Sequence, residues 1–419
     1  MPATTESSPS VSRFPRRRFL AGLTVLGAGA LGGLGLVALM LFLFVRLSWP
    51  HTEPLGSPEF GINFSCNYAE YLLLEDPTTS SGAPLPDDRP GRVEWCAATL
   101  GELLSGVGAK YVRLSVEWSQ VEQSPGAFDW SLIDALLAEA DRQGASVLLT
   151  VGVKAQRHPE YYIPAWALAG ARIQPDSDIS TAPYLRHRAL AMIEAAVRHV
   201  AASPAIDAWG ADNEPYVPSG RANGWKLGRD FVRAEVETIR RNDPASRPVS
   251  INHGQHFVFD RRWQDALADS DVLAQSLYAW RNYELFGWHF VVPILEIGPL
   301  APNYRAQARR ASDLGRQFWI TEMQAEPWFD GDMHTLSPLN PSPNLTADRF
   351  RKNLDYARRV GASRVYLWGA EWWLYQRQRY ADSTWWNLAR ETIASGARPQ
   401  SALRAGPQSM ASARTDSAP

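Results

Sequence analysis

Eight short apolar segments, spaced along residues 59–395, constrain the fold more than any other feature of this chain. Stretches with helical periodicity separate several of them, at 94–108, 130–143, 185–202 and 228–241. The strands predicted from these segments are 61–64, 111–116, 147–151, 206–210, 248–252, 272–276, 318–321 and 364–368. Continuous apolar runs, rather than alternating ones, are typical of strands buried on both faces, as in parallel sheets.

Eight strands with intervening helices predict an α/β fold, in which a parallel sheet closes into a (β/α)8 TIM barrel. The alternative is a doubly wound open sheet. No glycine-rich phosphate-binding loop follows the first predicted strand, which disfavours that alternative. We expect the barrel domain to span 59–395 and a disordered tail, rich in Ala, Ser, Arg and Pro, to follow at 396–419.

The sequence of the N-terminal region indicates the cellular location of the barrel domain. Residues 19–45 carry no charge and would span about 40 Å as a helix, enough to cross a bilayer. The arginines at 16–18 precede this run, so the positive-inside rule predicts a cytoplasmic segment at 1–18. They also resemble a twin-arginine export signal, although an ordinary positive flank of a membrane helix would look the same. We expect a transmembrane helix or export signal at 19–47, a stalk at 48–58, and a barrel outside the cytoplasm that is either membrane-anchored or secreted.

Composition narrows the range of partners. The net charge is -2 and no basic patch dominates, which argues against nucleic acid as a partner. The 17 tryptophans suggest a surface that stacks on sugar rings, unless they serve barrel packing. Cys66 and Cys96 lack the spacing of a metal site. They could form a disulfide in an oxidising compartment or remain two free thiols.

Polar and aromatic residues gather at the ends of the predicted strands, where barrel enzymes carry their catalytic groups. They are two carboxylates, an amide, a guanidinium, a phenol and an indole: Glu214, Glu322, Asn213, Arg113, Tyr278 and Trp368. Cleavage of a glycosidic bond needs one carboxylic acid to protonate the leaving oxygen and one carboxylate to attack the anomeric carbon or activate water. For a single strand-end glutamate, an ion pair that closes the barrel is the alternative interpretation.

The other strand-end residues suit the same chemistry. We expect the guanidinium of Arg113 to keep Glu322 ionised by favouring its charged form. The amide of Asn213 could bind the sugar 2-hydroxyl, and Trp368 would offer an apolar floor for the ring. Asp212 should point away from Asn213 and is not expected to be catalytic.

Three motifs carry a resemblance to a known superfamily. They are Trp-Gly-Ala-Asp-Asn-Glu-Pro at 209–215, Trp-Ile-Thr-Glu at 319–322, and the segment Glu-Trp-Ser-Gln-Val-Glu at 117–122 with Pro-Gly-Ala-Phe-Asp-Trp at 125–130. With them, residues 59–395 resemble the retaining clan A glycoside hydrolases, which place Asn-Glu-Pro after the fourth strand and Glu after the seventh. Family five is the nearest pattern, with families two, thirty-nine and forty-two as competitors.

The resemblance implies that Glu214 is the acid/base and Glu322 the nucleophile, with their carboxyls about 5–5.5 Å apart. It implies supporting roles for Arg113, Asn213 and Tyr278, together with Trp368. No metal or organic cofactor is expected, because the two carboxylates suffice for protonation and attack.

The third strand departs from the family pattern. Many relatives have a histidine at its end, but 152–158 reads Gly-Val-Lys-Ala-Gln-Arg-His here. Lys154 and Gln156 lie closer to the strand than His158, and His253 after the fifth strand is another candidate for binding the sugar. Trp280 and Glu371 are further predicted binding residues on loops around the mouth, although each could serve the core or the surface instead.

The sequence therefore predicts a retaining glycoside hydrolase that cleaves β-linked oligo- or polysaccharide outside the cytoplasm. A transglycosylase on the same site differs only in whether water or a sugar attacks the covalent intermediate. A barrel that binds glycans without catalysis is the alternative of another class, which would not need both glutamates. Sugar identity, linkage, endo or exo action and oligomeric state are not predicted.

Overall fold

The computed structural model describes residues 32–33, 35–40, 54–75, 88–219, 222–254, 259–285, 288–293, 302–329 and 331–396. The chain forms two compact units, of which one comprises Met1–Pro50 with Glu296–Pro299 and the other the remainder. In the first unit, residues 32–33 and 35–40 are helical. The rest of the predicted 19–47 segment, residues 1–18 and the tail from 397 lie outside the described residues. Within the described part of the chain, no helix combines the length and apolarity needed to cross a membrane.

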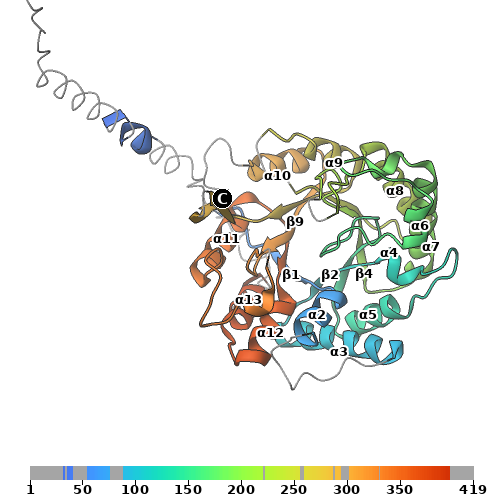
Figure 1. Ribbon diagram of the computed structural model, residues 1–419, viewed down its shortest axis with the longest axis horizontal. Helices are drawn as coiled ribbons and strands as arrows, with labels where there is room; N and C mark the ends of the chain where they lie inside the picture. Colours follow the sequence, from blue (N-terminus) through green and yellow to red (C-terminus); the bar gives the residue numbers. More distant parts are fainter. Residues whose placement is uncertain are drawn as a thin grey trace, which may run out of the picture. The chain divides into compact units, whose positions relative to one another are not determined.

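Eight parallel strands of the larger unit close into a barrel, which confirms the predicted (β/α)8 fold (Figure 1). Their order around the barrel is β1-β10-β9-β6-β5-β4-β3-β2. They are β1 Glu59–Asn63, β2 Tyr111–Ser115, β3 Ser146–Thr150, β4 Ile206–Asn213, β5 Val249–Asn252, β6 Val272–Leu277, β9 Gln317–Gln324 and β10 Arg364–Trp368. Each of the eight predicted strands overlaps one of these.

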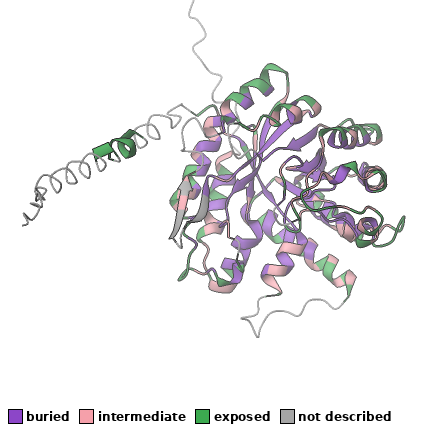
Figure 2. Ribbon diagram, turned by 45° about the horizontal axis from the view of Figure 1, so that its top comes forward, coloured by how far each residue is buried: buried purple, intermediate pink, exposed green. Residues whose placement is uncertain are grey.

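Helices surround the barrel, with buried faces toward the strands and exposed faces outward (Figure 2). They are α2 Cys66–Leu73, α3 Arg89–Val107, α4 Trp118–Val121, α5 Ser131–Arg142, α6 Ala165–Ala169, α7 Pro183–Val200, α8 Arg229–Asn242, α9 Trp263–Asp269, α10 Tyr304–Asp313, α11 Ala347–Val360, α12 Ala370–Tyr380 and α13 Thr384–Gly396. Their boundaries follow capping chemistry. In α3, for example, Asp88 accepts a hydrogen bond from the Gly91 amide, and Gly108 ends the helix at φ 72°.

One feature of the larger unit was not predicted. Between β6 and β9 the chain forms an antiparallel hairpin of β7 Trp280–Leu285 and β8 Trp288–Pro293. This hairpin pairs with itself and takes no part in the barrel sheet.

A packed apolar layer fills the barrel below its mouth. Its members come from five strands and are Leu148, Ala208, Val272, Trp319 and Tyr366. All are at most 2% exposed, so the barrel is filled at this level, as expected for this fold. Polar side chains above the layer therefore face the mouth and the solvent beyond it.

A β-bulge in β4 decides which side chain faces the mouth. Between Gly210 and Asn213, β4 has one residue more than its neighbour β5. Because Ala208 faces the interior, strict alternation would turn Asp212 inward. The extra residue turns Asn213 inward instead, where it contacts Arg113. Bulges commonly re-aim side chains next to active sites.

A second bulge acts in the same way on β9. Between Ile320 and Glu322, β9 has one residue more than β6. Since Trp319 packs in the interior layer, strict alternation would turn Glu322 toward the surrounding helices. The bulge turns it into the mouth, so both glutamate-bearing segments depend on an irregular strand.

A disulfide joins Cys66 of α2 to Cys96 of α3, with Cα atoms 5.6 Å apart. The sequence left open whether these cysteines form a disulfide or remain free thiols, and the structure has the disulfide. It fixes α2 beside the barrel, and α2 carries Tyr68, which lines the mouth.

Candidate active site

A cavity of about 600 Å³ opens at the carboxyl ends of the barrel strands. This volume is within the range of sites for small organic ligands. Five of the predicted site residues line it, namely Asn213, Glu214, Tyr278, Glu322 and Trp368. Arg113 lies buried beneath them and contacts two. The structure thus brings together all six strand-end residues.

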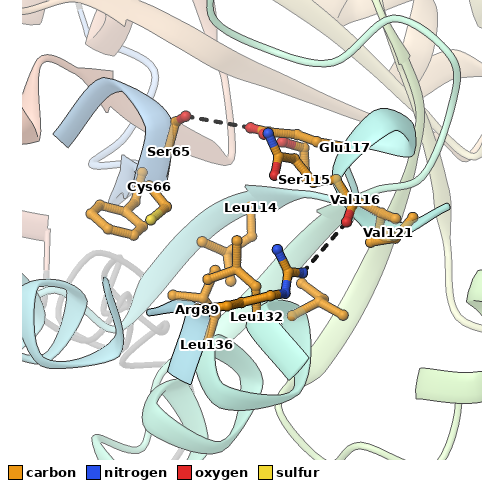
Figure 3. Close-up of a pocket in the computed structure, with 13 residues that line it drawn as sticks. Ser65, Cys66, Arg89, Leu114, Ser115, Val116, Glu117, Val121, Leu132 and Leu136 are labelled. Carbon is orange, nitrogen blue, oxygen red and sulfur yellow. Dashed lines mark hydrogen bonds between the residues drawn. The ribbon is translucent and has the colours of Figure 1, made fainter. Parts of the chain in front are cut away.

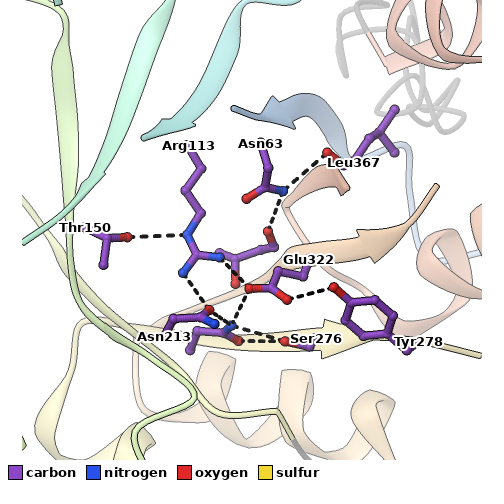
Figure 4. Close-up of polar contacts among 10 residues, drawn as sticks. Asn63, Arg113, Thr150, Asn213, Ser276, Tyr278, Glu322 and Leu367 are labelled. Carbon is purple, nitrogen blue, oxygen red and sulfur yellow. Dashed lines mark hydrogen bonds and ion pairs between the residues drawn. The ribbon is translucent and has the colours of Figure 1, made fainter. Parts of the chain in front are cut away.

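Glu322 is held by three donors (Figure 4). Arg113 Nη1 donates to Oε1 over 2.9 Å, the Tyr278 hydroxyl donates to Oε2 over 3.0 Å, and Asn252 Nδ2 makes a longer contact of 3.5 Å with Oε1. Arg113 Nη2 also donates to Asn213 Oδ1 over 2.9 Å. The network fixes the orientation of the Glu322 carboxyl at the base of the cavity.

The ionisation of Glu322 reflects opposing influences. Burial raises its pKa to about 7, Arg113 lowers it, and the nearby Glu214 carboxyl raises it again. Arg113 therefore acts in the expected direction but does not outweigh the loss of water around a buried carboxyl. The two glutamates therefore lie close enough to interact electrostatically.

Lys154 bonds to three consecutive residues around Glu214. Its amide donates to Asp212 Oδ1 over 2.8 Å, its carbonyl accepts from the Asn213 amide over 2.7 Å, and its Nζ donates to the Glu214 carbonyl over 2.9 Å. The Lys154 side chain is 1% exposed and also pairs with Glu160 over 3.3 Å. This departure from the family pattern therefore holds the backbone of Glu214 in place.

Glu214 itself has an unusual backbone conformation. Its φ is 48°, in the left-handed region that non-glycine residues rarely adopt. Its carboxyl lies directly against the backbone of Gly254, where a Cβ would lie 1.9 Å from Oε1. Gly254 thus leaves the space that the Glu214 carboxyl occupies.

Asp212 lies on the other side of β4, away from the cavity. Its carboxyl and that of Glu235 on α8 are both buried, hydrogen-bonded to each other, and shifted to higher pKa, first of all by burial. The pKa of Asp212 rises to about 6. Two buried carboxyls in contact share a proton more readily than both ionise. Through Asp212, this pair accepts the hydrogen bond from the Lys154 amide and so helps to hold Lys154 in place.

A second buried arginine lies at the same mouth. Arg157, in the loop after β3, is paired with Glu326 and with Glu371, whose Oε2 lies 2.8 Å from Nη2. Its guanidinium carbon lies 3.8 Å from the ring centroid of Tyr68 and 4.0 Å from that of Trp368. Arg157 therefore covers one face of the Trp368 ring that we expected to serve as a floor for the sugar.

Three predicted binding residues do not line the cavity. His253 is fully buried, with Nε2 3.4 Å from Asp260. Trp280 begins the unpredicted hairpin, and its indole donates to Asn353 of α11 over 3.0 Å. Glu371 is fully buried in the first turn of α12, where it accepts from the Ser65 amide over 2.7 Å and reaches the cavity only through Arg157. Their expected direct contact with substrate is corrected accordingly.

A much smaller cavity, of about 20 Å³, lies behind the ends of β1 and β2 (Figure 3). It has room for about one water molecule. Glu117 lines it, receives a hydrogen bond from Asn67, and makes a 3.5 Å contact with the Ser65 hydroxyl. Burial raises the pKa of Glu117 to about 8, against the effect of these hydrogen bonds. This cavity is too small for a sugar.

Four contributors to the site were not predicted: Arg157, Asn252, Gly254 and Tyr68. Asn252 ends the fifth strand, so its position alone could have drawn attention to it. Arg157 lies in an irregular loop with φ 73°, and no pattern in the sequence indicates where its side chain points.

Among the comparisons with known proteins, only the comparison with solved structures finds similar proteins, and it concerns the fold. The chain matches no protein-family model and no curated protein. Among solved structures, it is similar to a β-galactosidase from Rahnella sp. R3, with a TM-score of 0.53 and 12% identity over 82% of this chain and 56% of that one. It is also similar to a variant of GH5_18 from Bifidobacterium longum subsp. longum in complex with Manb1-4GlcNAc, with a TM-score of 0.50 and 12% identity over 74% and 68% of the two chains.

The chain spans about half the length of the β-galactosidases that it matches. At these identities, the likeness shows a shared (β/α)8 fold. By their descriptions, these two solved structures are a β-galactosidase and a GH5_18 protein.

Proposed function

We propose that this protein is a retaining glycoside hydrolase that cleaves β-linked oligo- or polysaccharide. One observation carries the proposal: Glu214 and Glu322, from the ends of β4 and β9, line one sugar-sized cavity, and Glu322 is oriented by Arg113 and Tyr278. A retaining glycosidase needs two such carboxyls, one as acid/base and one as nucleophile.

In this mechanism, the proton for the leaving oxygen is carried by Glu214. Arg113 and Tyr278 both favour the ionised form of Glu322. In the first step, Glu322 attacks the anomeric carbon while Glu214 gives its proton to the leaving oxygen, so the aglycone departs as an alcohol. In the second step, Glu214 takes a proton from water, whose oxygen attacks the anomeric carbon and releases Glu322 as a carboxylate. Two inversions give net retention.

The pKa of Glu322 predicts the acid side of the pH profile. Since the nucleophile must be ionised and its pKa is raised to about 7, kcat/KM should fall as pH drops below about 7. Loss of the Glu214 proton should lower the rate on the alkaline side, which gives a bell-shaped profile.

The test is a panel of chromogenic β-glycosides with wild type, Glu322→Ala, Glu214→Ala and the surface control Glu237→Ala. We expect turnover by wild type and the control only. Azide should restore the turnover of Glu214→Ala and yield a β-glycosyl azide. Azide can attack the glycosyl-enzyme intermediate because it needs no general base. NMR of the first-formed product should show the β anomer. A wild type that binds glycans but cleaves no substrate would be a binding module.

We further propose that the barrel acts outside the cytoplasm. The charge-free run at 19–45 behind the arginines at 16–18 supports export or anchoring, and the Cys66–Cys96 disulfide is typical of oxidising compartments. Protease added to intact host cells should digest the barrel of an anchored protein. Protection in intact cells, with digestion only after lysis, would contradict an exposed location.

A further inference from the structure

Asp212 and Glu235 form a buried pair of carboxyls that the proposed mechanism does not use. Asp212 lies in β4 and is 1% exposed, while Glu235 lies in α8 and is fully buried. Their side chains are hydrogen-bonded to each other, and neither residue lines the large cavity. The pair therefore lies behind the strand end that carries Asn213 and Glu214, where it has no access to substrate.

One oxygen of each carboxyl binds the segment after β3. Asp212 Oδ1 accepts from the Lys154 amide over 2.8 Å. Glu235 Oε1 makes a longer bond of 3.4 Å with the Val153 amide. The other two oxygens, Asp212 Oδ2 and Glu235 Oε2, are buried and receive no hydrogen bond from a third residue in the described part of the chain. Since an ionised carboxyl has no hydrogen to donate, one member of the pair must be protonated for the two side chains to bond.

The charges around the pair favour Glu235 as the protonated member. Lys154 stabilises the ionised form of Asp212, whereas Asp212 disfavours the ionised form of Glu235. The other charged or titratable groups around the pair are Glu160, Tyr161, Arg186 and Tyr216. Of these, Arg186 of α7 favours a charged Glu235, but its Nη2 is bonded to the Asp230 carbonyl over 3.2 Å. Within the described residues no cation forms an ion pair with Glu235, so a charge on it would be buried without compensation.

Lys154 connects this pair to Glu214. The Lys154 carbonyl accepts from the Asn213 amide over 2.7 Å, and Nζ donates to the Glu214 carbonyl over 2.9 Å. The backbone of Glu214 is in the left-handed region, with φ 48°. A conformation of this kind persists only where the surrounding structure holds it. The hydrogen bonds through Lys154 are therefore part of what keeps Glu214 in place.

We propose that Glu235 is a positioning residue for catalysis, whose protonated carboxyl donates to Asp212 and so holds Lys154 and, through it, the backbone of Glu214. This inference rests on the proposed function, since Glu214 is the acid/base there. Without the proton, two buried negative charges would be in contact and would repel each other. The pair would then separate, and the Lys154 amide would lose the acceptor that fixes it.

The test compares Glu235→Gln and Glu235→Leu with the matched control Glu237→Gln, which changes an exposed glutamate of the same helix. Glutamine keeps a donor for Asp212 and an acceptor for the Val153 amide, whereas leucine removes both at similar volume. We expect kcat within threefold of wild type for Glu235→Gln and the control, and at least tenfold lower for Glu235→Leu. KM should change less than threefold in all three variants, because Glu235 does not touch substrate. Unchanged kcat in Glu235→Leu, or an equal loss in Glu235→Gln, would overturn the inference while the proposed function stands.

Hydrogen–deuterium exchange with mass spectrometry tests the positioning without turnover. In the peptide that contains the Asn213 amide, exchange should be at least tenfold faster in Glu235→Leu than in wild type, Glu235→Gln or the control. That result with no substrate cleaved by wild type would refute the proposed function and support the link from Glu235 to the strand end. Equal exchange in all four proteins would overturn the link.

Infrared spectroscopy decides the matter if Glu235→Leu does not fold. The difference spectrum between wild type and Glu235→Gln at pH 7 should contain the carbonyl band of a protonated carboxyl. A carboxylate band in its place would show that Glu235 is ionised, which would overturn the inference.

Discussion

Two arginines are buried at the mouth of the same barrel, and each holds carboxyl groups, yet their surroundings differ. Arg113 extends from a regular strand to one carboxylate and shares its remaining contacts with neutral groups. Arg157 extends from an irregular loop to two carboxylates and lies over two aromatic rings. The first arrangement orients a single reactive group, and the second neutralises charges that would otherwise be buried without compensation. We therefore expect Arg113 to matter mainly for catalysis and Arg157 mainly for stability.

The largest effect should come from Arg157→Met, which leaves Glu326 and Glu371 buried without their cation. We expect the free energy of unfolding to fall by about 3–5 kcal/mol at pH 7. Burial already raises the pKa of Glu326 and Arg157 lowers it, so without the arginine this pKa should rise further and the loss should shrink as pH falls from 8 to 5. Denaturant unfolding at several pH values measures this.

The control for that measurement is Arg229→Met. Arg229 also contacts two carboxylates, Asp265 over 2.6 Å and Asp269 over 2.7 Å, but it is 41% exposed. An exposed pair contributes about 0–1 kcal/mol. Equal losses for the two variants would contradict the view that burial gives the ion pairs of Arg157 their importance.

Arg113→Met should reduce kcat/KM by about 10²- to 10³-fold, the loss typical when a preorganised charged donor is removed. Its cost in stability should be smaller than that of Arg157→Met, because a single carboxyl with a pKa of about 7 can take up a proton instead. The acid limb of the pH–rate profile should move to higher pH. If Arg113→Met lost stability but retained kcat/KM, Arg113 would have the stabilising role that we assign to Arg157.

Glu117 offers a third case, a buried carboxyl whose contacts are with the neutral groups of Asn67 and Ser65. Its pKa of about 8, against an ordinary 4.5, means that the folded state binds a proton more tightly than the unfolded state. Wild-type stability should therefore fall as pH rises from 4.5 to 8, relative to Glu117→Gln. We expect a relative change of about 3–4 kcal/mol over this range, since each pKa unit corresponds to about 1.4 kcal/mol. If the pH–stability curves of wild type and Glu117→Gln ran parallel, the pKa of Glu117 would not be raised in the folded state.

The smallest effect should come from Gly254→Ala, which moves Glu214 without touching either arginine. The new Cβ would lie 1.9 Å from Glu214 Oε1, so the carboxyl has to shift. Because the obstacle is the end of a flexible side chain, the melting temperature should stay close to that of wild type. We expect kcat/KM to fall about tenfold, since misplacement of a catalytic group is costly. Unchanged kinetics would mean that Glu214 does not need its present position.

The contrast between the two arginines also explains what the sequence could predict. The eight strands follow from buried apolar runs, and a barrel brings strand ends together, so Arg113, Asn213 and Tyr278 could be placed from their positions. The bulges that turn Asn213 and Glu322 inward have no signature in the residues themselves. Strict alternation would have placed Asp212 at the mouth instead.

Loop residues were harder to place, because their side-chain directions depend on tertiary contacts. Arg157 was missed for this reason, and Glu371 was expected at the cavity although it lies behind that arginine. Trp280 was expected at the mouth because the β7–β8 hairpin was not predicted. His253 follows a strand end but faces Asp260.

The central claim is that Glu322 is the nucleophile of a retaining reaction. The most direct measurement is inactivation with a 2-deoxy-2-fluoro-β-glycosyl fluoride of a sugar that the enzyme cleaves, followed by peptide mass spectrometry. The account predicts one label per chain, on Glu322, and no label in Glu322→Ala. A label on Glu214 or on another carboxylate, or rapid turnover to an α-configured product, would contradict it.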